Sequence, residues 1–357
     1  MFKTFPKPSN HNKLHNRLYA DKFAKQADFK PKIYITMTLN DIRQLIQSDI
    51  EATDQLILER LASDVILINQ IGHYIINNGG KRLRPLIVLL SARACQYSGD
   101  QHRVMAAVIE FIHTSTLLHD DVVDESDTRR GKKTANEVWG NAASVLVGDF
   151  LYSRSFEMMV EPGIMRVMQV MSEATNVIAE GEVLQLLNCH DADTDEARYM
   201  EVIHRKTAKL FEAAAQMGPV LSQQPELEKA FALYGRHLGA AFQLIDDVLD
   251  YTASSEELGK SIGDDLAEGK PTLPLIYAMQ HGQDAQKQII KRAIETDGIA
   301  LLTEVTDIIK QTGAIEFTQQ KAQQEAELAK QALVDVPDSK YKQALIALAD
   351  MAVNRRH

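Results

Sequence analysis

Residues 104–124 read VMAAVIEFIHTSTLLHDDVVD, and this stretch decides the fold class. Its first fifteen residues contain one charged residue at pH 7, Glu110, and their apolar side chains recur at helical spacing. A helix that is apolar on more than one face has to be buried on most sides. We therefore predict a long helix at the centre of a bundle. Residues 170–187 are similarly poor in charge, and we predict a central position for them too.

The rest of the chain supports an all-α fold. Apolar residues make up 45% of the 357 residues, and 18 Gly and 10 Pro are too few breakers for a sheet protein with many turns. The predicted helices cover residues 42–77, 85–97, 101–126, 135–160, 164–189, 194–217, 226–251 and 272–281, with shorter ones to the C-terminus. Nothing resembles an interdomain linker, so we predict one large bundle over residues 37–357.

Composition restricts the partners and the compartment. The net charge is −10, and residues 37–357 are more acidic still, which makes nucleic acid an unsuitable partner. Apolar runs such as 86–90 are far shorter than the ~18 residues of a membrane span. Cys95 and Cys189 lie far apart without a CxxC pattern, so they indicate neither a disulfide framework nor a zinc site. We predict a cytoplasmic protein.

Residues 1–36 form a basic extension with eight Lys or Arg and two Asp. They lack the apolar core of a secretory signal. We interpret them either as a disordered tail or as the result of a start codon placed upstream of the true Met37, and favour the second. Residues 38–41, which read TLND, supply helix-capping side chains directly after Met37.

A repeated acidic motif carries the strongest functional signal. DDVVD at residues 120–124 and DDVLD at residues 246–250 each follow a strongly apolar helical stretch. Carboxylates at a helix C-terminus repel each other and oppose the helix dipole, so the arrangement is costly without cations. The first and last Asp of each motif are four residues apart, on one helical face. Oxygen donors without His or Cys favour Mg²⁺ that bridges to substrate phosphates.

Basic residues accompany these acids. GGKRLRP at residues 79–85 places three cations at a Gly-led helix start, where backbone N–H groups also favour an anion. Arg129 and Arg130 follow the first acidic motif, Lys206 and Lys209 form a further set, and Lys260 and Lys270 follow the second motif. Any one cluster is more often a solvated face, but together with the aspartates they predict a diphosphate site.

These motifs resemble those of a known family. LLHDDVVDESDTRRG, GGKRLRP, FQLIDDVLD and GKSIGDDLAEGKPTLPL are similar to the motifs of the trans-type polyprenyl diphosphate synthases, and the resemblance extends from Leu39 to the C-terminus. It implies the all-helical isoprenoid synthase fold with a central active-site cavity. It also implies a homodimer that lengthens an allylic diphosphate, such as farnesyl diphosphate, with isopentenyl diphosphate.

The resemblance assigns roles residue by residue. The implied ligands of about three Mg²⁺ ions are Asp120, Asp124 and Asp246, supported by Asp121, Asp247 and Asp250. The implied isopentenyl diphosphate contacts are Lys81, Arg84, His113 and Arg130. The implied allylic diphosphate contacts are Arg129, Lys206, Thr207, Gln243 and Lys260, and Lys270 would add to the positive charge around this diphosphate. Lys206 is also assigned a catalytic role, together with the three metal ligands. His113 could instead be a core histidine, but it lies two helical turns before Asp120.

The implied reaction needs no protein nucleophile. Ionisation of the allylic C–O bond gives a carbocation, which the double bond of isopentenyl diphosphate attacks before a proton is lost. Small residues at Ser115 and Thr116, with Ile112 beyond them, would leave a tunnel open for a long chain. The resemblance implies a product of eight or nine isoprene units for quinone side chains. Met158, Met159, Met168 and Met171 are weaker candidates for a tunnel floor, because methionines are more often plain core.

Other functions remain open at this point. A terpene cyclase also begins with DDxxD, but its second motif usually mixes Asn or Asp, Ser or Thr, and Glu. A noncatalytic subunit of a heteromeric synthase commonly loses motif residues that this chain keeps. A cation-stabilised scaffold would release no diphosphate. A long prenyl product is a lipid, so the protein would contact a membrane only transiently, when it releases this product.

Overall fold

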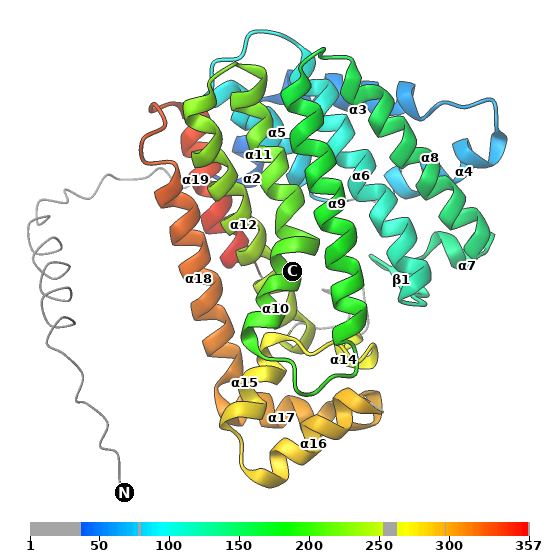
Figure 1. Cartoon of the computed structure of the whole chain (residues 1–357), viewed down its shortest axis with the longest axis vertical. Coiled ribbons are helices and arrows are strands. Elements are labelled where there is room, and N and C mark those ends of the chain that lie inside the picture. Colours follow the sequence, from blue (N-terminus) through cyan, green and yellow to red (C-terminus); the bar gives the residue numbers. More distant parts are fainter. Residues whose placement is uncertain (1–36, 78–79, 253–262, 297, 356–357) are drawn as a thin grey trace, which may run out of the picture. The chain divides into compact units, whose positions relative to one another are not determined.

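The computed structural model describes residues 37–77, 80–252, 263–296 and 298–355 (Figure 1). The all-α prediction is confirmed, because the two-residue strands β1 (Thr128–Arg129) and β2 (Lys132–Lys133) are the only strands in these ranges. The predicted extension 1–36 lies outside the described residues. None of the described helices has both the length and the apolar character that crossing a membrane requires.

The first half of the described chain divides into shorter helices than predicted. These are α2 (Leu39–Leu45), α3 (Gln47–Leu61), α4 (Ile66–Asn77), α5 (Leu83–Ala94), α6 (Gln101–Val123), α7 (Ala135–Trp139), α8 (Asn141–Val160) and α9 (Met165–Asn188). The predicted capping residue Thr38 accepts a hydrogen bond from the backbone N–H of Asp41. The single helix predicted over 42–77 is wrong, because Asn69 bonds the backbone of Ser63 and holds a loop there.

The second half contains the longest helix and the small helices near the cavity. The elements are α10 (Glu196–Val202), the π-helix η1 (Ile203–Ala208), α11 (Lys209–Leu221), α12 (Pro225–Thr252), α14 (Asp264–Ala267), α15 (Leu273–His281), α16 (Asp284–Glu295), the 3₁₀-helix η2 (Ile299–Leu301), α17 (Leu302–Thr312), α18 (Ala314–Ala332) and α19 (Lys340–Val353). Figure 1 shows α6, α9, α11, α12 and α18 running along the long axis.

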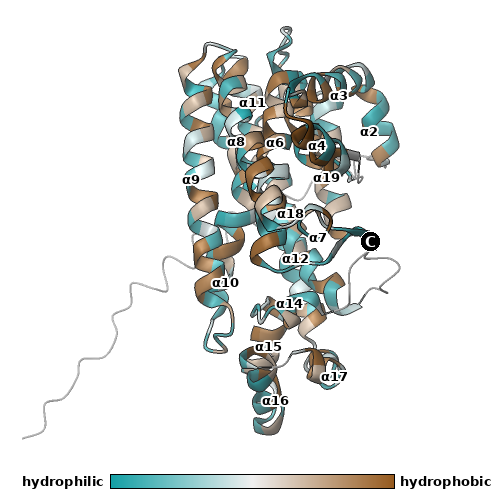
Figure 2. Cartoon of the chain, turned by 90° about the vertical axis from the view of Figure 1, so that its right-hand side faces the viewer, coloured by the Kyte–Doolittle hydropathy of each residue, from teal (hydrophilic) through white to brown (hydrophobic). Residues whose placement is uncertain are grey.

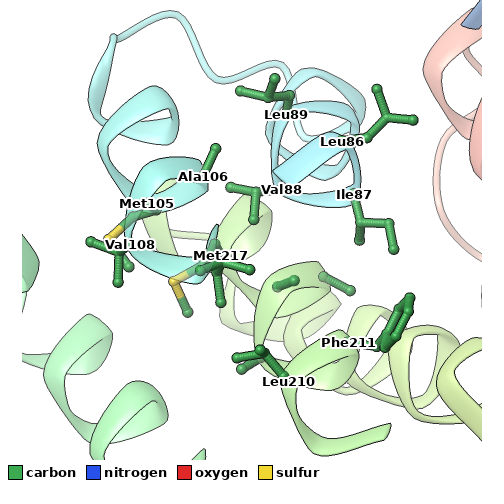
Figure 3. Close-up of a cluster of buried hydrophobic side chains, with 14 of the residues drawn as sticks. Leu86, Ile87, Val88, Leu89, Met105, Ala106, Val108, Leu210, Phe211 and Met217 are labelled. Atoms are coloured by element: carbon green, nitrogen blue, oxygen red, sulfur yellow. The ribbon is translucent and has the colours of Figure 1, made fainter. Parts of the chain in front are cut away.

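Helix α6 lies at the centre, as its sequence predicts. It carries a nearly continuous row of fully buried residues from Met105 to Ile112. Figure 3 shows how its Met105, Ala106 and Val108 lie near side chains of α5 and α11, among them Val88 and Met217. Burial of this much apolar surface fixes α6 in place and therefore fixes the aspartates at its C-terminus.

The predicted break at Gly218 and Pro219 is wrong, because α11 continues to Leu221. Gly218 lies against the backbone of Ser91 in α5, so closely that a Cβ atom on it would be 2.4 Å from the Ser91 carbonyl carbon. The glycine therefore permits a close helix contact and does not end the helix.

The prediction of a mostly buried helix over residues 170–187 is also wrong. One face of α9 packs inward through residues such as Val170 and Met171, but Val183, Leu186 and Leu187 are each more than half exposed. Figure 2 shows hydrophobic and hydrophilic residues together on α9. The low charge content of α9 therefore reflects an apolar face that is exposed in this chain, and not burial on most sides.

A small hairpin follows the first acidic motif and was not predicted. Arg130 and Gly131 connect β1 to β2, and both have positive φ values, 54° and 73°. Two such residues are typical of a tight hairpin turn whose twist matches the strands. The hairpin carries Arg129 and Arg130 back toward the end of α6.

Candidate functional site

A cavity of about 810 Å³ lies where the two acidic motifs meet. The predicted site residues on its wall are Lys81, Arg84, His113, Thr116, Asp120, Asp124, Arg129, Arg130, Lys206, Thr207, Gln243, Asp246, Asp247, Asp250 and Lys270. They come from α5, α6, η1, α12, the hairpin and the segments before α5 and α15. Residues far apart in the sequence are therefore brought to one site.

The first acidic motif faces two lysines. Asp120 Oδ2 lies 3.5 Å from Lys206 Nζ, and Asp124 Oδ2 lies 3.1 Å from Lys270 Nζ. All four side chains are less than one fifth exposed. Burial alone would lower the pKa of Lys206, but Asp120 and Glu182 raise it above its usual value. Both lysines therefore stay charged and offset the repulsion between the carboxylates.

The second acidic motif combines one accessible carboxylate with buried ones. Asp246 is 40% exposed in its side chain and pairs with Arg355, whose Nη2 lies 2.6 Å from Asp246 Oδ1. Arg355 also stacks on Phe242, 3.8 Å from the ring centre. Asp247 and Asp250 are buried in the wall of the cavity.

A chain of hydrogen bonds holds the buried Asp247. Thr207 donates to Gln243 Oε1 at 3.2 Å, and Gln243 Nε2 donates to Asp247 Oδ1 at 2.8 Å. The Tyr199 hydroxyl donates to the other oxygen of Asp247. Burial, with Asp265 nearby, raises the pKa of Asp247 well above that of an ordinary carboxyl. The chain links η1 rigidly to α12.

Lys206 is positioned by an irregular turn. It lies in the π-helix η1, whose backbone passes so close to α9 that a Cβ on Gly181 would be 2.6 Å from the Lys206 nitrogen. π-Turns occur frequently at functional sites. Glu182, the next residue of α9, holds Lys206 Nζ at 2.5 Å. Burial, with Asp120 and Asp124 nearby, raises the pKa of Glu182 to about 7.

The other end of the cavity is cationic. Arg84 Nη1 lies 3.2 Å from His113 Nε2, and its guanidinium stacks on Phe211 at 4.4 Å. Burial lowers the pKa of Arg84 to about 10. Gly80 lets Arg130 approach, since a Cβ there would be 2.6 Å from Arg130 Nη1. Three basic side chains thus surround a space suited to an anion.

Some predicted residues lie elsewhere. Asp121 is buried beside the cavity and pairs with Arg129, at 2.6 Å from its Nη2, so it anchors the hairpin. Ser115 is buried and donates to the carbonyl of Gly148 at 2.8 Å, and Ile112 is buried in the core, whereas Thr116 reaches the cavity wall. Lys260 lies outside the described residues.

The wall residues that the sequence did not indicate as part of the site include Glu110, Glu182, Tyr199 and Arg355. Glu110 was noticed only as the single charge in an apolar helix, which was itself a signal. Glu182 directly precedes the apolar residues of α9 that are exposed, so the local sequence does not mark it as a residue of the cavity wall. The sequence around Tyr199 and Arg355 does not indicate a role in the site, because their aspartate partners lie 48 and 109 residues away along the chain.

The donor set fits a hard divalent cation completed by substrate. Asp120, Asp124 and Asp246 offer only carboxylate oxygens to the cavity. Among the described residues, no three His, Cys, Asp or Glu side chains converge as ligands of one ion. Mg²⁺ binds in this way, because it keeps water ligands and takes further oxygens from substrate phosphates.

Comparison with known proteins agrees with this geometry. The family model described as polyprenyl synthetase matches residues 65–312. The chain is 57% identical to octaprenyl diphosphate synthase of Escherichia coli K12, over 89% of this chain and 99% of that protein. It is 46% identical to the geranyl-diphosphate-specific all-trans-nonaprenyl-diphosphate synthase of Rhodobacter capsulatus, over 88% and 97%.

A solved structure is similar over nearly the same length. The polyprenyl synthase of Caulobacter crescentus CB15, crystallised with calcium and isoprenyl diphosphate, superimposes with a TM-score of 0.87 at 43% identity. The match covers 90% of this chain and 99% of that one.

The burial of His113 predicts a pH-dependent stability. Burial, with Arg84, Arg130 and Arg129 nearby, holds the pKa of His113 well below its usual 6.5. As the pH falls below 6.5, the unfolded chain binds a proton that the folded chain does not, so the free energy of unfolding falls. We expect wild type to lose up to about 1 kcal/mol more than His113→Gln between pH 7.5 and 5.5 in urea titrations. Equal losses would contradict the assignment.

Proposed function

This chain belongs to the polyprenyl synthetase family, and we propose that it is a prenyltransferase that adds isopentenyl diphosphate units to an allylic diphosphate primer. One observation carries the proposal: both acidic motifs and the cationic cluster around Arg84 line the same cavity. The cavity can therefore accept two diphosphates side by side, one through metal ions and one through arginine and lysine.

The acidic part of the cavity is the proposed site of the allylic diphosphate. Asp120, Asp124 and Asp246 would hold Mg²⁺, about three ions by family resemblance, which would neutralise charge on the departing diphosphate. Lys206 and Lys270 already lie against these carboxylates. Arg129 is held at the same wall by Asp121. These cations would share the diphosphate oxygens as negative charge develops on them.

The cationic part is the proposed site of isopentenyl diphosphate. Lys81, Arg84 and Arg130 would bind its diphosphate, and neutral His113 would accept a hydrogen bond from Arg84 and so orient the guanidinium. Burial lowers the pKa values of Lys81 and Arg84; that of Arg84 falls only to about 10, so its guanidinium stays positively charged at neutral pH. Two fixed diphosphates would place their hydrocarbon parts next to each other.

The bond changes follow from this placement. The allylic C–O bond breaks and its electron pair leaves with the diphosphate, close to Lys206 and Lys270. The double bond of isopentenyl diphosphate then forms the new C–C bond with the allylic cation. Loss of a proton from the adjacent carbon restores an alkene, and the released diphosphate is the nearest base. The product keeps the diphosphate of isopentenyl diphosphate and can react again.

Neutralising the carboxylates should remove activity without unfolding the protein. We expect Asp120→Asn and Asp246→Asn to lower kcat about a hundredfold or more, because each removes a charge from the metal-binding set. The measurement is incorporation of labelled isopentenyl diphosphate into farnesyl diphosphate with Mg²⁺, using this chain alone.

Asp149→Asn is the matched control, because Asp149 is an exposed carboxylate of α8 outside the cavity. It should keep wild-type kcat. Activity of the chain alone would also argue against a noncatalytic subunit. Near-normal elongation by either motif variant would contradict the assignment.

We further propose a long product, of eight or nine isoprene units, for quinone side chains. Relatives with these product names share about half or more of their residues with this chain. Thr116 and Leu117 continue the cavity wall beyond Asp120, and Ile178 faces it from α9. The fully buried Met105, Met158, Met159 and Met171 lie in the adjoining core. Methionines are flexible enough to move aside for a growing chain.

Blocking this route should shorten the product. We expect Thr116→Phe to give short prenyl chains, because its ring would occupy the cavity wall beneath Asp120. Ser115→Phe should also shorten the product. Its ring would replace the hydrogen bond from Ser115 to the Gly148 carbonyl, so this variant also perturbs the packing of α6 against α8. Chromatography of the dephosphorylated products measures chain length. Unchanged length in a folded Thr116→Phe protein would refute the tunnel.

We also propose a cytoplasmic location. The Cys95 and Cys189 thiols are free, which suits a reducing compartment such as the cytoplasm.

We propose a homodimer formed through α8 and α9. These helices expose Leu146, Val160, Met165, Val183, Leu186 and Leu187, all more than half accessible. A monomer rarely exposes so many large apolar residues on neighbouring elements, and such patches mark protein contacts.

A charge on this face should prevent dimerisation. We expect Leu186→Glu to halve the mass measured by light scattering, because the carboxylate would be buried unpaired in the dimer. Val334→Glu is the control, since Val334 is equally exposed but follows α18. A dimeric Leu186→Glu protein would refute this interface.

A further inference from the structure

Glu110 is a carboxylate in the cationic part of the cavity that the reaction described above does not use. It lies on α6 one helical turn before His113, lines the same cavity and is 13% exposed in its side chain. Glu110 is also the single acidic residue in the apolar stretch 104–118. A buried acid beside residues that bind an anion weakens that binding, so its presence needs a reason.

The surroundings of Glu110 are mainly cationic. Its Oε1 lies 3.8 Å from Arg82 Nε. Burial raises the pKa of Glu110, and the positive charges of Arg82, Arg84 and Arg130 oppose that rise by stabilising its charged form. Asp54 of α3 is the other acid nearby, and it pairs with Arg82. Three arginines thus surround one carboxylate at the site proposed for isopentenyl diphosphate.

Glu110 does not hold these arginines by close hydrogen bonds. The pair with Arg82 is long, and Glu110 Oε2 is buried without a hydrogen bond from any residue that the structure describes. Arg84 is oriented instead by His113 and by the Phe211 ring. The effect of Glu110 on the pocket is therefore mainly its negative charge, which acts through space at low dielectric.

We propose, building on the function proposed above, that Glu110 weakens the hold of the cationic pocket on a diphosphate. Each condensation leaves the lengthened chain with the diphosphate that arrived in this pocket. Before the next addition that diphosphate must leave for the aspartate-lined part of the cavity, a transfer in which no covalent bond changes. The carboxylate reduces the net charge around Arg84 and Arg130 and makes this departure faster.

The sign of the effect distinguishes this role from structural support. Loss of a supporting residue would disorder the arginines and raise KM for isopentenyl diphosphate. Loss of a charge that weakens binding would lower it. For one unit charge several ångströms from a diphosphate, a tenfold change is of the expected order at an effective dielectric constant of about 20.

The test uses Glu110→Gln, with Glu212→Gln as its control. Glu212 is a similarly buried carboxylate, 18% exposed, that pairs with Lys209 outside the cavity. For Glu110→Gln we expect KM for isopentenyl diphosphate to fall about tenfold, KM for farnesyl diphosphate to stay within twofold, and later additions to slow relative to the first. Glu212→Gln should match wild type. An unchanged or raised KM for isopentenyl diphosphate would overturn the proposal.

A binding measurement separates this inference from the proposed activity. Calorimetric titration with inorganic diphosphate in EDTA needs no turnover, and Glu110→Gln should bind it several-fold more tightly than wild type does. Glu110→Met, neutral and of similar volume, should show the same direction if Glu110→Gln folds poorly. Equal or weaker binding in the folded variants overturns the role of Glu110, whereas absence of elongation by wild type overturns the proposed function.

Discussion

Repulsion among carboxylates that share one cavity is the constraint on which the site depends. Aspartates at the ends of α6 and α12 face the same space, and nothing in either helix neutralises them. Their partners come from elsewhere: Lys206 from η1, Lys270 from the segment before α15, and Arg355 from the end of α19. The fold thus holds in place a set of negative charges that distant segments of the chain neutralise with cations.

Helix α6 joins the two chemical halves of the cavity. Its face presents Glu110 and His113 to the cationic half, and Asp120 and Asp124 two to four turns further on to the acidic half. Because the other faces of α6 are packed in the core, the spacing between the halves is fixed by helix geometry. A reaction between two bound diphosphates needs this kind of fixed separation.

Close helix packing makes the arrangement rigid. Gly218 lets α11 approach α5, and Gly181 lets η1 approach α9. The second contact places Glu182 next to Lys206, so a glycine far from the acidic motifs in the sequence determines where a predicted site residue points. Packing of this density transmits a change at one helix to its neighbours.

The amino-acid sequence by itself determined the all-α class, the central helix α6, the two acidic motifs and most of the cationic residues, because helical periodicity and motif spacing are local properties. It misjudged α9, since low charge content does not tell whether an apolar face meets the core or remains exposed in one chain. It also gave no sign of Tyr199 or Arg355. Their roles come from partners distant in the chain, and only tertiary packing decides which distant groups meet and which carboxylates lose their contact with water.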